Sequence, residues 1–367
     1  MLFKPFALRS IPLRNRLVMA PMTRNRAVEN NVPNALMAEY YRQRTSLGLL
    51  ITEGTSPSAN GLGYARIPGL FTPEQVAGWR RVTDGVHARG GRIFVQLMHT
   101  GRASHVDNLP AGARVVGPVA TPLAGDIYTD TKGLQKASPP HPLTEAEIAT
   151  TVAEYAHSAK LAIEAGFDGV ELHGANGYLI EQFLNPNLNT RADSHGGSIA
   201  ARNRFALDVA RATVAAIGPD RVGIRISPYG AFNEMGAFGE VEAQYLALVR
   251  DLSGLGLVYL HLVDHSSMGA PALPAEFKTR LRKAFDGVFI ASGGFDRAGA
   301  EQILADGGAD LVAFGRPALA NPDLAKRLER NLALNPPDFT TFYTPGEKGY
   351  TDYPVWAPAR ELLETIG

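Results

Sequence analysis

The chain has 367 residues, 45% of them hydrophobic and 20% charged, which is enough for one large α/β domain or two smaller ones. Its 36 basic and 36 acidic residues cancel, so no net charge would attract a nucleic acid or an anionic membrane, and we expect neither as a partner. No apolar run approaches the roughly 20 residues that span a bilayer, and the N-terminus lacks a signal-peptide core, so we expect a cytoplasmic protein. The absence of cysteine excludes disulfides, cysteine-ligated iron–sulfur clusters and thiolate catalysis, and any redox chemistry therefore needs an organic cofactor.

Short apolar runs alternate with helical patterns along nearly the whole chain, which is typical of parallel βαβ units. The predicted strands cover residues 17–19, 49–53, 92–96, 169–172, 221–226, 258–262, 288–291 and 311–314. Eight such units predict an α/β fold of the (β/α)8 TIM-barrel type, as a single domain over residues 1–367. A doubly wound sheet is less well supported, because no GxGxxG fingerprint occurs.

Three helices have recognisable starts. Thr72 to Gln75 and Thr144 to Glu147 match capping boxes, and Asn321 before Pro322 predicts a further helix cap. A helix is also predicted over the tail, residues 357–367. After Thr144, apolar residues recur at helical spacing and predict a core-facing stripe: Ile148, Val152, Tyr155, Ala159 and Ile163.

Two segments depart from a minimal barrel. Residues 6–13, with a turn at Arg9 and Ser10, predict a small N-terminal hairpin that closes the bottom of the barrel. Residues 98–143, rich in Pro, Gly and Thr, are too long for a simple connector between the third strand and its helix. We expect this insertion to form a lid over the top.

In a TIM barrel the chemistry lies at the carboxyl ends of the strands. The side chains at these ends are unusually polar and convergent. They are Pro21, Met22, Thr23, Gly54, Gln96, the HGANGY segment 173–178, Arg225, Gly293, Gly294, Gly315 and Arg316. Strand alternation predicts that Gln96, His173 and Arg225 face the barrel mouth while their apolar neighbours face the helices.

The last two strands end in SGG and FGR, where this fold commonly binds phosphate. Glycine backbone N–H groups can approach a phosphate closely, and Arg316 can grip it with a charged fork. Flavin mononucleotide (FMN) fits a site that also includes Gln96 and Arg225. The Gln96 amide can pair with the pyrimidine edge of the ring, and Arg225 can stabilise negative charge on the reduced ring.

The HGANGY segment then suits substrate chemistry. His173 and Asn176 can both donate hydrogen bonds to a carbonyl oxygen and stabilise charge that develops there. Tyr178 is a weak acid, with an ordinary pKa of about 10, that can protonate a carbanion-like carbon. Hydride delivery at one carbon and proton delivery at the next describe reduction of an activated C=C bond.

At this point the chain closely resembles the old yellow enzyme family of FMN-dependent ene-reductases. The resemblance runs from about Phe3 to Trp356. It rests on RNRLVMAPMTRNRA, TEGT, FVQLMHTGR, FDGVELHGANGYLIEQFLNPNLNTRAD, GIRISPYG, FGRPALANPDL, and TFY followed by GYTDYP. These motifs occur in order and at the barrel positions described above.

The resemblance implies tightly bound, non-covalent FMN, reduced by NADPH or NADH, with activated alkenes then reduced in the same pocket by a ping-pong scheme. The implied FMN contacts are Pro21, Met22, Thr23, Gly54, Gln96, Arg225, Gly293, Gly294, Gly315 and Arg316. The implied catalytic residues are His173 and Asn176, which hold the substrate's activating group, and Tyr178, the proton donor. The implied pocket walls are Tyr343, Tyr64 and Met98, and Met98 stands where many members have tryptophan, which indicates a roomier pocket.

Other functions are compatible with a barrel of this kind. An FMN-dependent hydroxy-acid oxidase would use His173 as a base, and a non-redox sugar-phosphate lyase or isomerase would use the SGG and FGR loops for its substrate. A binding protein without catalysis would not explain so many polar strand ends. We expect no metal site, because His261 and His265 lie ~13 Å apart on an extended segment. Glu171 should face the barrel interior and need a donor there, such as an arginine on a neighbouring strand. Nothing in the sequence favours a monomer over a homo-oligomer, or NADPH over NADH.

Overall fold

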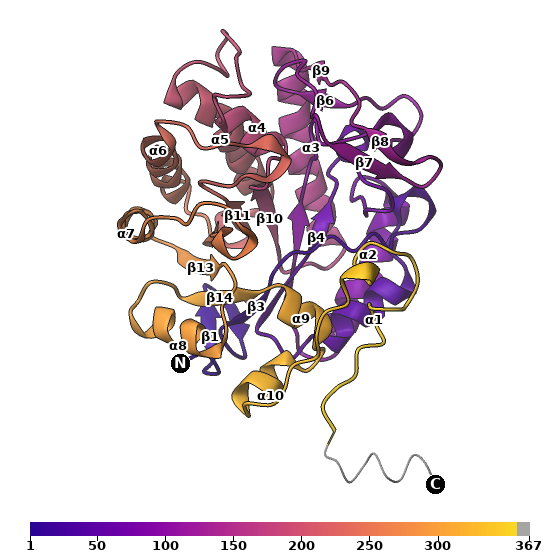
Figure 1. The fold of residues 1–367 in the computed structure, drawn as a ribbon, viewed down its shortest axis with the longest axis vertical. Coiled ribbons are helices and arrows are strands. Elements are labelled where there is room, and N and C mark those ends of the chain that lie inside the picture. Colours follow the sequence, from indigo (N-terminus) through magenta and orange to yellow (C-terminus); the bar gives the residue numbers. More distant parts are fainter. Residues whose placement is uncertain (358–367) are drawn as a thin grey trace.

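The computed structural model describes residues 1–357, and its centre is a closed barrel of eight parallel strands (Figure 1). The strands follow one another round the barrel in chain order: β3 Leu17–Met19, β4 Leu49–Thr55, β5 Ile93–Leu97, β10 Gly169–Gly174, β11 Val222–Ile226, β12 Tyr259–Val263, β13 Val288–Ser292 and β14 Leu311–Phe314. The barrel closes where Val18 of its first strand pairs with Ala313 of its last. The predicted TIM barrel is therefore confirmed.

Helices surround the barrel (Figure 1). They are α1 Ala35–Gln43, α2 Pro73–His87, α3 Glu145–Glu164, α4 Leu179–Leu184, α5 Ile199–Ile217, α6 Val241–Gly254, α7 Ala275–Ala284, α8 Arg297–Ala305, α9 Arg316–Ala320 and α10 Leu324–Glu329. Short 3₁₀ turns cover Glu29–Asn31, Ala59–Gly61, Val106–Asn108, Pro219–Arg221, Phe232–Glu234, Ser266–Met268 and Phe339–Thr341. Of the helices in the described part of the chain, none is long and apolar enough to cross a membrane.

Two of the three predicted helix starts are confirmed. Thr72 and Thr144 cap α2 and α3, each in a reciprocal capping box. The third prediction is wrong: α10 begins at Leu324, and Asn321 ends α9 instead. The Asn321 side chain is used elsewhere, since its Oδ1 accepts a hydrogen bond from the backbone N–H of Asn335 at 2.7 Å. The helix predicted over residues 357–367 lies outside the described residues, apart from Ala357.

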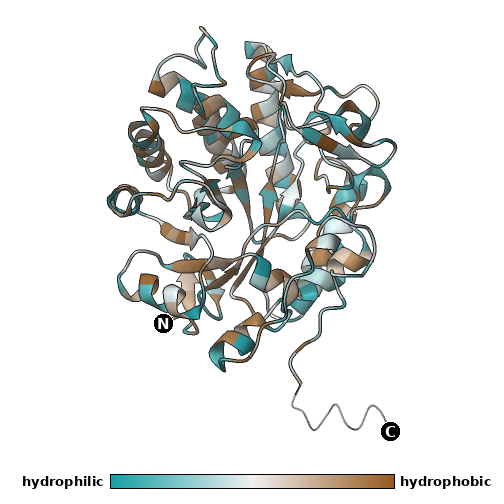
Figure 2. Ribbon diagram, in the orientation of Figure 1, coloured by the Kyte–Doolittle hydropathy of each residue, from teal (hydrophilic) through white to brown (hydrophobic). Residues whose placement is uncertain are grey.

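Strand alternation divides the side chains as predicted. Val95, Val170, Leu172, Ile224 and Ile226 are buried in the large cluster between the barrel and its helices. Four of the five predicted α3 stripe residues belong to the same cluster or pack against it, namely Ile148, Val152, Tyr155 and Ala159, whereas Ile163 is half-buried outside it. In Figure 2 brown predominates along the central strands, whereas teal and brown alternate on the surrounding helices. The largest part of the core is therefore a shell of apolar side chains between the barrel and its helices.

The predicted N-terminal hairpin is present. Strands β1 Phe6–Leu8 and β2 Ile11–Leu13 pair in antiparallel fashion, and Arg9 in the turn has a positive φ of 52°. Leu8 and Leu13 are buried in a second apolar cluster with inward-facing barrel residues, among them Phe94. The hairpin therefore plugs one end of the barrel, and the other end carries the site.

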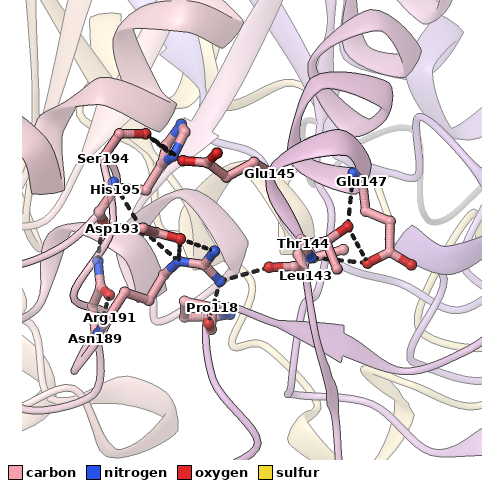
Figure 3. Close-up of polar contacts among 10 residues, drawn as sticks. All are labelled: Pro118, Leu143, Thr144, Glu145, Glu147, Asn189, Arg191, Asp193, Ser194 and His195. Carbon is pink, nitrogen blue, oxygen red and sulfur yellow. Dashed lines mark hydrogen bonds and ion pairs between the residues drawn. The ribbon is translucent and has the colours of Figure 1, made fainter.

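The insertion 98–143 has structure of its own. Within it, β6 Val116–Gly117 pairs with β9 His141–Pro142, and between these two strands β7 Asp126–Thr129 and β8 Gly133–Lys136 form a hairpin. Arg191 holds the residues that follow β6 and β9, because its guanidinium donates to the carbonyls of Pro118 at 2.8 Å and Leu143 at 2.6 Å (Figure 3).

Buried arginines hold the segment 341–350 against the rest of the fold. Arg24, which is fully buried, donates to the carbonyl of Phe342 at 3.1 Å and to that of Gly349 at 2.7 Å. Arg26 donates to the carbonyls of Phe342 and Thr341 at 2.7 and 2.8 Å. These contacts join residues just after β3 to a segment more than 300 residues later in the chain.

A tyrosine stack supports these arginines. The rings of Tyr40 and Tyr350 stack at 4.1 Å, and the Arg44 guanidinium lies 3.8 Å from the centre of the Tyr40 ring. Arg44 also donates to the Tyr350 carbonyl at 3.3 Å. These three arginines are buried away from water, and their carbonyl and aromatic partners take the place of the water they have lost.

Arg24→Met should lower the free energy of unfolding by about 1–3 kcal/mol, because it leaves the buried Gly349 carbonyl without its donor and removes one of the two donors to the Phe342 carbonyl. Arg14→Met is a matched control: Arg14 also donates to two carbonyls, those of Arg89 and Gly90, but it is exposed, so water can replace it. Its effect should stay below about 0.5 kcal/mol. Urea unfolding of both variants measures the difference, and equal losses would show that burial of Arg24 adds nothing.

Candidate active site

The structure brings the predicted polar side chains together at the open end of the barrel. In the strand pairing, His173 of β10 lies beside Arg225 of β11, and Arg225 beside His261 of β12. On the other side of β10, Glu171 lies beside Gln96 of β5. All five residues are buried. Gln96, His173 and Arg225 are therefore neighbours on adjacent strands, as the alternation predicted.

Glu171 organises the barrel interior beneath this site. Its carboxylate accepts a hydrogen bond from Gln96 Nε2 at 2.7 Å and pairs with His261 Nδ1 at 2.8 Å. The donors are thus an amide and an imidazole, where we had expected an arginine. The first bond orients the Gln96 amide and leaves its oxygen to accept from a ring N–H group above it.

His173 is set up as a neutral hydrogen-bond donor. Its Nδ1 accepts from the backbone N–H of Ala175 at 3.2 Å, so a neutral ring carries its proton on Nε2. Burial lowers the pKa of His173 well below its usual range, and the nearby Arg225, His261 and His265 lower it further. The imidazole can therefore donate from Nε2 without being charged.

Tyr178 lies directly beside His173. Their rings meet edge to face with centres 4.9 Å apart, and Tyr64 packs against Tyr178 at 6.1 Å in the same manner. Burial raises the pKa of Tyr178 well above its usual value, and the proximity of Tyr64 adds to this shift. The Tyr178 phenol is therefore protonated at neutral pH and available as an acid.

Asn176 is held in an uncommon backbone conformation, with φ of +60°. Its N–H donates to Ser227 Oγ at 3.0 Å and its carbonyl accepts from Asn233 Nδ2 at 2.8 Å. Its side-chain Oδ1 is buried and has no partner among the described residues. The loop fixes the backbone of Asn176 and leaves the amide side chain for a ligand.

Several other buried polar atoms at the mouth also lack a hydrogen-bond partner among the described residues. Their positions allow a check of whether a flavin fits. The buried atoms with no hydrogen-bond partner in the described part of the chain include Asn176 Oδ1, Arg225 Nε, His261 Nε2 and His265 Nδ1. Burial also lowers the pKa of Arg225, which is the cost of keeping this guanidinium away from water. A ring system that carries both hydrogen-bond donors and acceptors could satisfy these atoms. The residues at the mouth therefore fit the ring of FMN.

The predicted phosphate-binding residues lie at the ends of β13 and β14. Gly294 has φ of +81°, which only glycine adopts readily, and Gly315 precedes Arg316 at the start of α9. Arg316 is exposed, with its guanidinium 5.4 Å from the ring centre of Phe339. A Cβ on Gly315 would lie 3.7 Å from Met22 Sδ, so the ends of β14 and β3 are adjacent. Pro21, Met22 and Thr23 therefore border the same side of the mouth as the phosphate loops.

Met98 is buried close to Tyr178. It is buried in a small apolar cluster against which Tyr64 and Tyr178 pack. A Cβ on Gly54 would collide with the Met98 thioether, so Met98 explains why glycine stands at position 54. Tyr343, by contrast, is 58% exposed at the rim, and its carbonyl accepts from Arg66 Nη2 at 2.9 Å.

Sequence reasoning missed the residues that support the HGANGY loop. Glu181, Ser227 and Asn233 all bond to Asn176, to Gly177 or to one another. A signal for Glu181 was present, because it is the one acidic residue in the apolar run LIEQFL that follows Tyr178. Ser227 and Asn233 belong to a different strand end, and no local pattern links them to the loop.

A second polar cluster lies where α3 begins (Figure 3). Glu145, Asp193 and His195 place one potential ligand atom each within 4.8 Å of one another. Asp193, however, forms an ion pair with Arg191, and Ser194 Oγ donates to Glu145 at 2.9 Å. An arginine already neutralises this site, so the cluster serves to anchor the insertion.

Comparison with known proteins gives consistent results. Residues 1–335 match the model of the NADH:flavin oxidoreductase / NADH oxidase family. The chain is 41% identical to 12-oxophytodienoate reductase 7 of Oryza sativa subsp. japonica, covering 96% of this chain and 94% of that one. It is 42% identical to chanoclavine-I aldehyde reductase of Penicillium roqueforti, covering 99% and 98%. The structure of morphinone reductase superposes with a TM-score of 0.93 at 42% identity, covering 97% and 96%, and that of its complex with tetrahydroNAD with a TM-score of 0.92.

The lowered pKa of His173 predicts a pH effect on stability. Below pH ~6.5 a histidine in the unfolded chain binds a proton that the folded protein does not, so the free energy of unfolding falls as pH falls, by up to about 1.4 kcal/mol per pH unit. His173→Gln removes this contribution. Urea unfolding between pH 7.5 and 5 should therefore show a smaller loss for the variant than for the wild type. Parallel curves would mean that His173 takes up its proton in the folded state.

Proposed function

Because the chain belongs to the NADH:flavin oxidoreductase family, that of old yellow enzyme, and is thus an NAD(P)H-dependent FMN enzyme, we propose that it reduces activated C=C bonds. The substrates are small α,β-unsaturated carbonyl or nitro compounds. The observation that carries this proposal is the pairing of two neutral donors, His173 and Asn176, with the protonated Tyr178. Family membership sets aside the sugar-phosphate lyase or isomerase.

The residues that would hold FMN fall into two groups. Those at the ring are Pro21, Met22, Thr23, Gly54, Gln96 and Arg225, and those at the phosphate are Gly293, Gly294, Gly315 and Arg316. When bound, FMN supplies the hydride. Arg225 is buried and cationic, so it favours the negative charge of a reduced ring. Gln96, whose amide Glu171 orients, would hold the ring through its amide oxygen, which can accept from an N–H group.

Substrate activation depends on the charge state of His173. The Nε2–H group and the Asn176 amide both donate to the oxygen that conjugates with the C=C bond, and they strengthen as negative charge builds there. Because the lowered pKa keeps the imidazole neutral, His173 acts here by hydrogen bonding and leaves proton transfer to Tyr178. Tyr178 then donates its phenolic proton to the carbon that becomes carbanion-like.

The insertion 98–143 is proposed to act as a lid over this pocket, and Met98, Tyr64 and Tyr343 as its walls. Arg66 supports this role, because it forms an ion pair with Asp130 on the β7–β8 hairpin. The same guanidinium group donates to the Tyr343 carbonyl, and its Nε donates to the carbonyl of Asn25 at 3.0 Å. One side chain thus ties the insertion to both sides of the rim.

A ping-pong scheme is proposed, in which NAD(P)H and the alkene use the same pocket in turn. The first test is the visible spectrum of the purified protein under anaerobic conditions. The flavin band should bleach on adding NADPH and return on adding 2-cyclohexenone. A band that bleaches and stays bleached would keep the flavin enzyme and reject enone reduction. Oxygen-dependent turnover of lactate without NADPH would instead support a hydroxy-acid oxidase.

Tyr178→Phe should separate the two halves of the cycle. The variant keeps the ring contact with His173 but loses the transferable proton, so re-oxidation by the enone should slow by about 10²-fold or more. Reduction by NADPH needs no proton from Tyr178 and should change by less than about twofold. Stopped-flow absorbance measures both rates, with Tyr353→Phe as the control, because the Tyr353 phenol accepts a hydrogen bond from the backbone of Asp338 and is not among the proposed site residues. Equal slowing of both half-reactions would remove Tyr178 from the role of proton donor.

A further inference from the structure

Glu181, on the first turn of α4, is a buried carboxyl group that the mechanism above does not use. It is 3% exposed, and in the described part of the chain no basic side chain pairs with it. Burial raises its pKa to about 7, even though three donors oppose this shift. Burying an acidic group without a cation costs free energy, so its contacts need a functional explanation.

The three donors connect Glu181 to the catalytic loop. Glu181 Oε2 accepts from the backbone N–H of Gly177, and Oε1 accepts from Ser227 Oγ and from Tyr245 Oη, each at 2.9 Å. Ser227 Oγ in turn accepts from the backbone N–H of Asn176 at 3.0 Å. One carboxyl group therefore reaches two consecutive peptide groups, one directly and one through a hydroxyl.

These two peptide groups set the direction of the catalytic side chains. Asn176 and Gly177 both have positive φ, 60° and 72°, and Tyr178 follows at once. A positive φ at a residue other than glycine costs free energy and persists only where the surroundings hold it. Releasing the two N–H groups would let the turn relax and change where Asn176 and Tyr178 point.

We propose that Glu181 is a positioning residue, whose carboxyl group fixes the turn at Asn176 and Gly177 and thereby aims the Asn176 amide and the Tyr178 phenol at the substrate. This inference rests on the proposed function for its catalytic consequence. Its structural part, the fixing of the turn, does not.

Three variants remove different parts of the hydrogen bonding around the Glu181 carboxyl group. Glu181→Leu removes every acceptor at similar volume. Glu181→Gln keeps one oxygen for Gly177 and should recover part of the loss. Tyr245→Phe is the matched control, because it removes a donor to the same carboxyl group but leaves both routes to the turn intact.

The first readout is hydrogen exchange resolved to single amides on the FMN-loaded protein. Glu181→Leu should speed exchange at Asn176 and Gly177 by tenfold or more, with a smaller effect in Glu181→Gln and none in Tyr245→Phe. This readout does not depend on any reaction. Unchanged exchange at both amides would overturn the proposal.

The second readout is the pair of half-reaction rates. Re-oxidation by 2-cyclohexenone should slow about tenfold in Glu181→Leu while reduction by NADPH changes by less than about threefold. In the Tyr178→Phe background the same substitution should slow re-oxidation by less than it does in the wild type, because the part that acts through the Tyr178 phenol is already lost and only the part through Asn176 remains. Fully additive effects, or equal slowing of both half-reactions, would show a general structural role and overturn the positioning role.

The two readouts separate this inference from the proposed function. If the wild-type flavin is not re-oxidised by the enone, enone reduction fails, and the exchange data alone decide whether Glu181 fixes the turn. If Glu181→Leu does not fold, Ser227→Ala replaces it. That variant cuts only the indirect route, so exchange should rise at Asn176 and stay slow at Gly177, and slow exchange at both would contradict the relay.

Discussion

A closed parallel barrel forces the carboxyl ends of its eight strands to one rim, and the site depends on this constraint. The register of β10 against β11 sets His173 beside Arg225, and the register against β5 sets Glu171 beside Gln96. A slip of one residue would turn His173 toward the helices and Leu172 toward the mouth. The apolar shell outside the barrel prevents such a slip, because it would bury polar groups among helices. Apolar packing on the outer face of each strand thus fixes which polar side chains point to the barrel mouth.

Burial then gives the rim its electrostatic character. It keeps the His173 imidazole neutral and the Tyr178 phenol protonated, so both act as donors that carry no charge of their own. Arg225 is the buried cation beside them, and Glu171 is balanced by Gln96 and His261. Away from water, each of these donors interacts more strongly with charge that develops on a ligand than it would at the surface. Removing these groups from water is unfavourable for folding, but it strengthens their interaction with charge on a ligand.

The barrel and much of the rim could be predicted from the sequence because both follow from local patterns. Apolar runs located the strands, and the rule that function lies at strand ends selected Gln96, His173 and Arg225. Contacts between distant segments could not be predicted in this way. Nothing near Arg24 or Arg26 indicates that they hold residues 341–350, and nothing near Ser227 indicates that it links Glu181 to Asn176. Asn321 illustrates the opposite error: its local pattern suits a helix cap, but a bond to Asn335 decides its conformation.

Barrel closure has a consequence for how the protein is made. Val18 pairs with Ala313, and most of the hydrogen bonds that Arg24 and Arg26 donate go to residues 341–350. A chain that has not yet been made as far as β14 and residues 341–350 therefore lacks the last neighbour of β3 and most of the acceptors for these two arginines. The loop that must close to join the first strand to the last is nearly the whole chain, which makes this late step slow. Since the ends of β3 and β14 border the same side of the mouth, that side of the mouth is complete only once the barrel has closed.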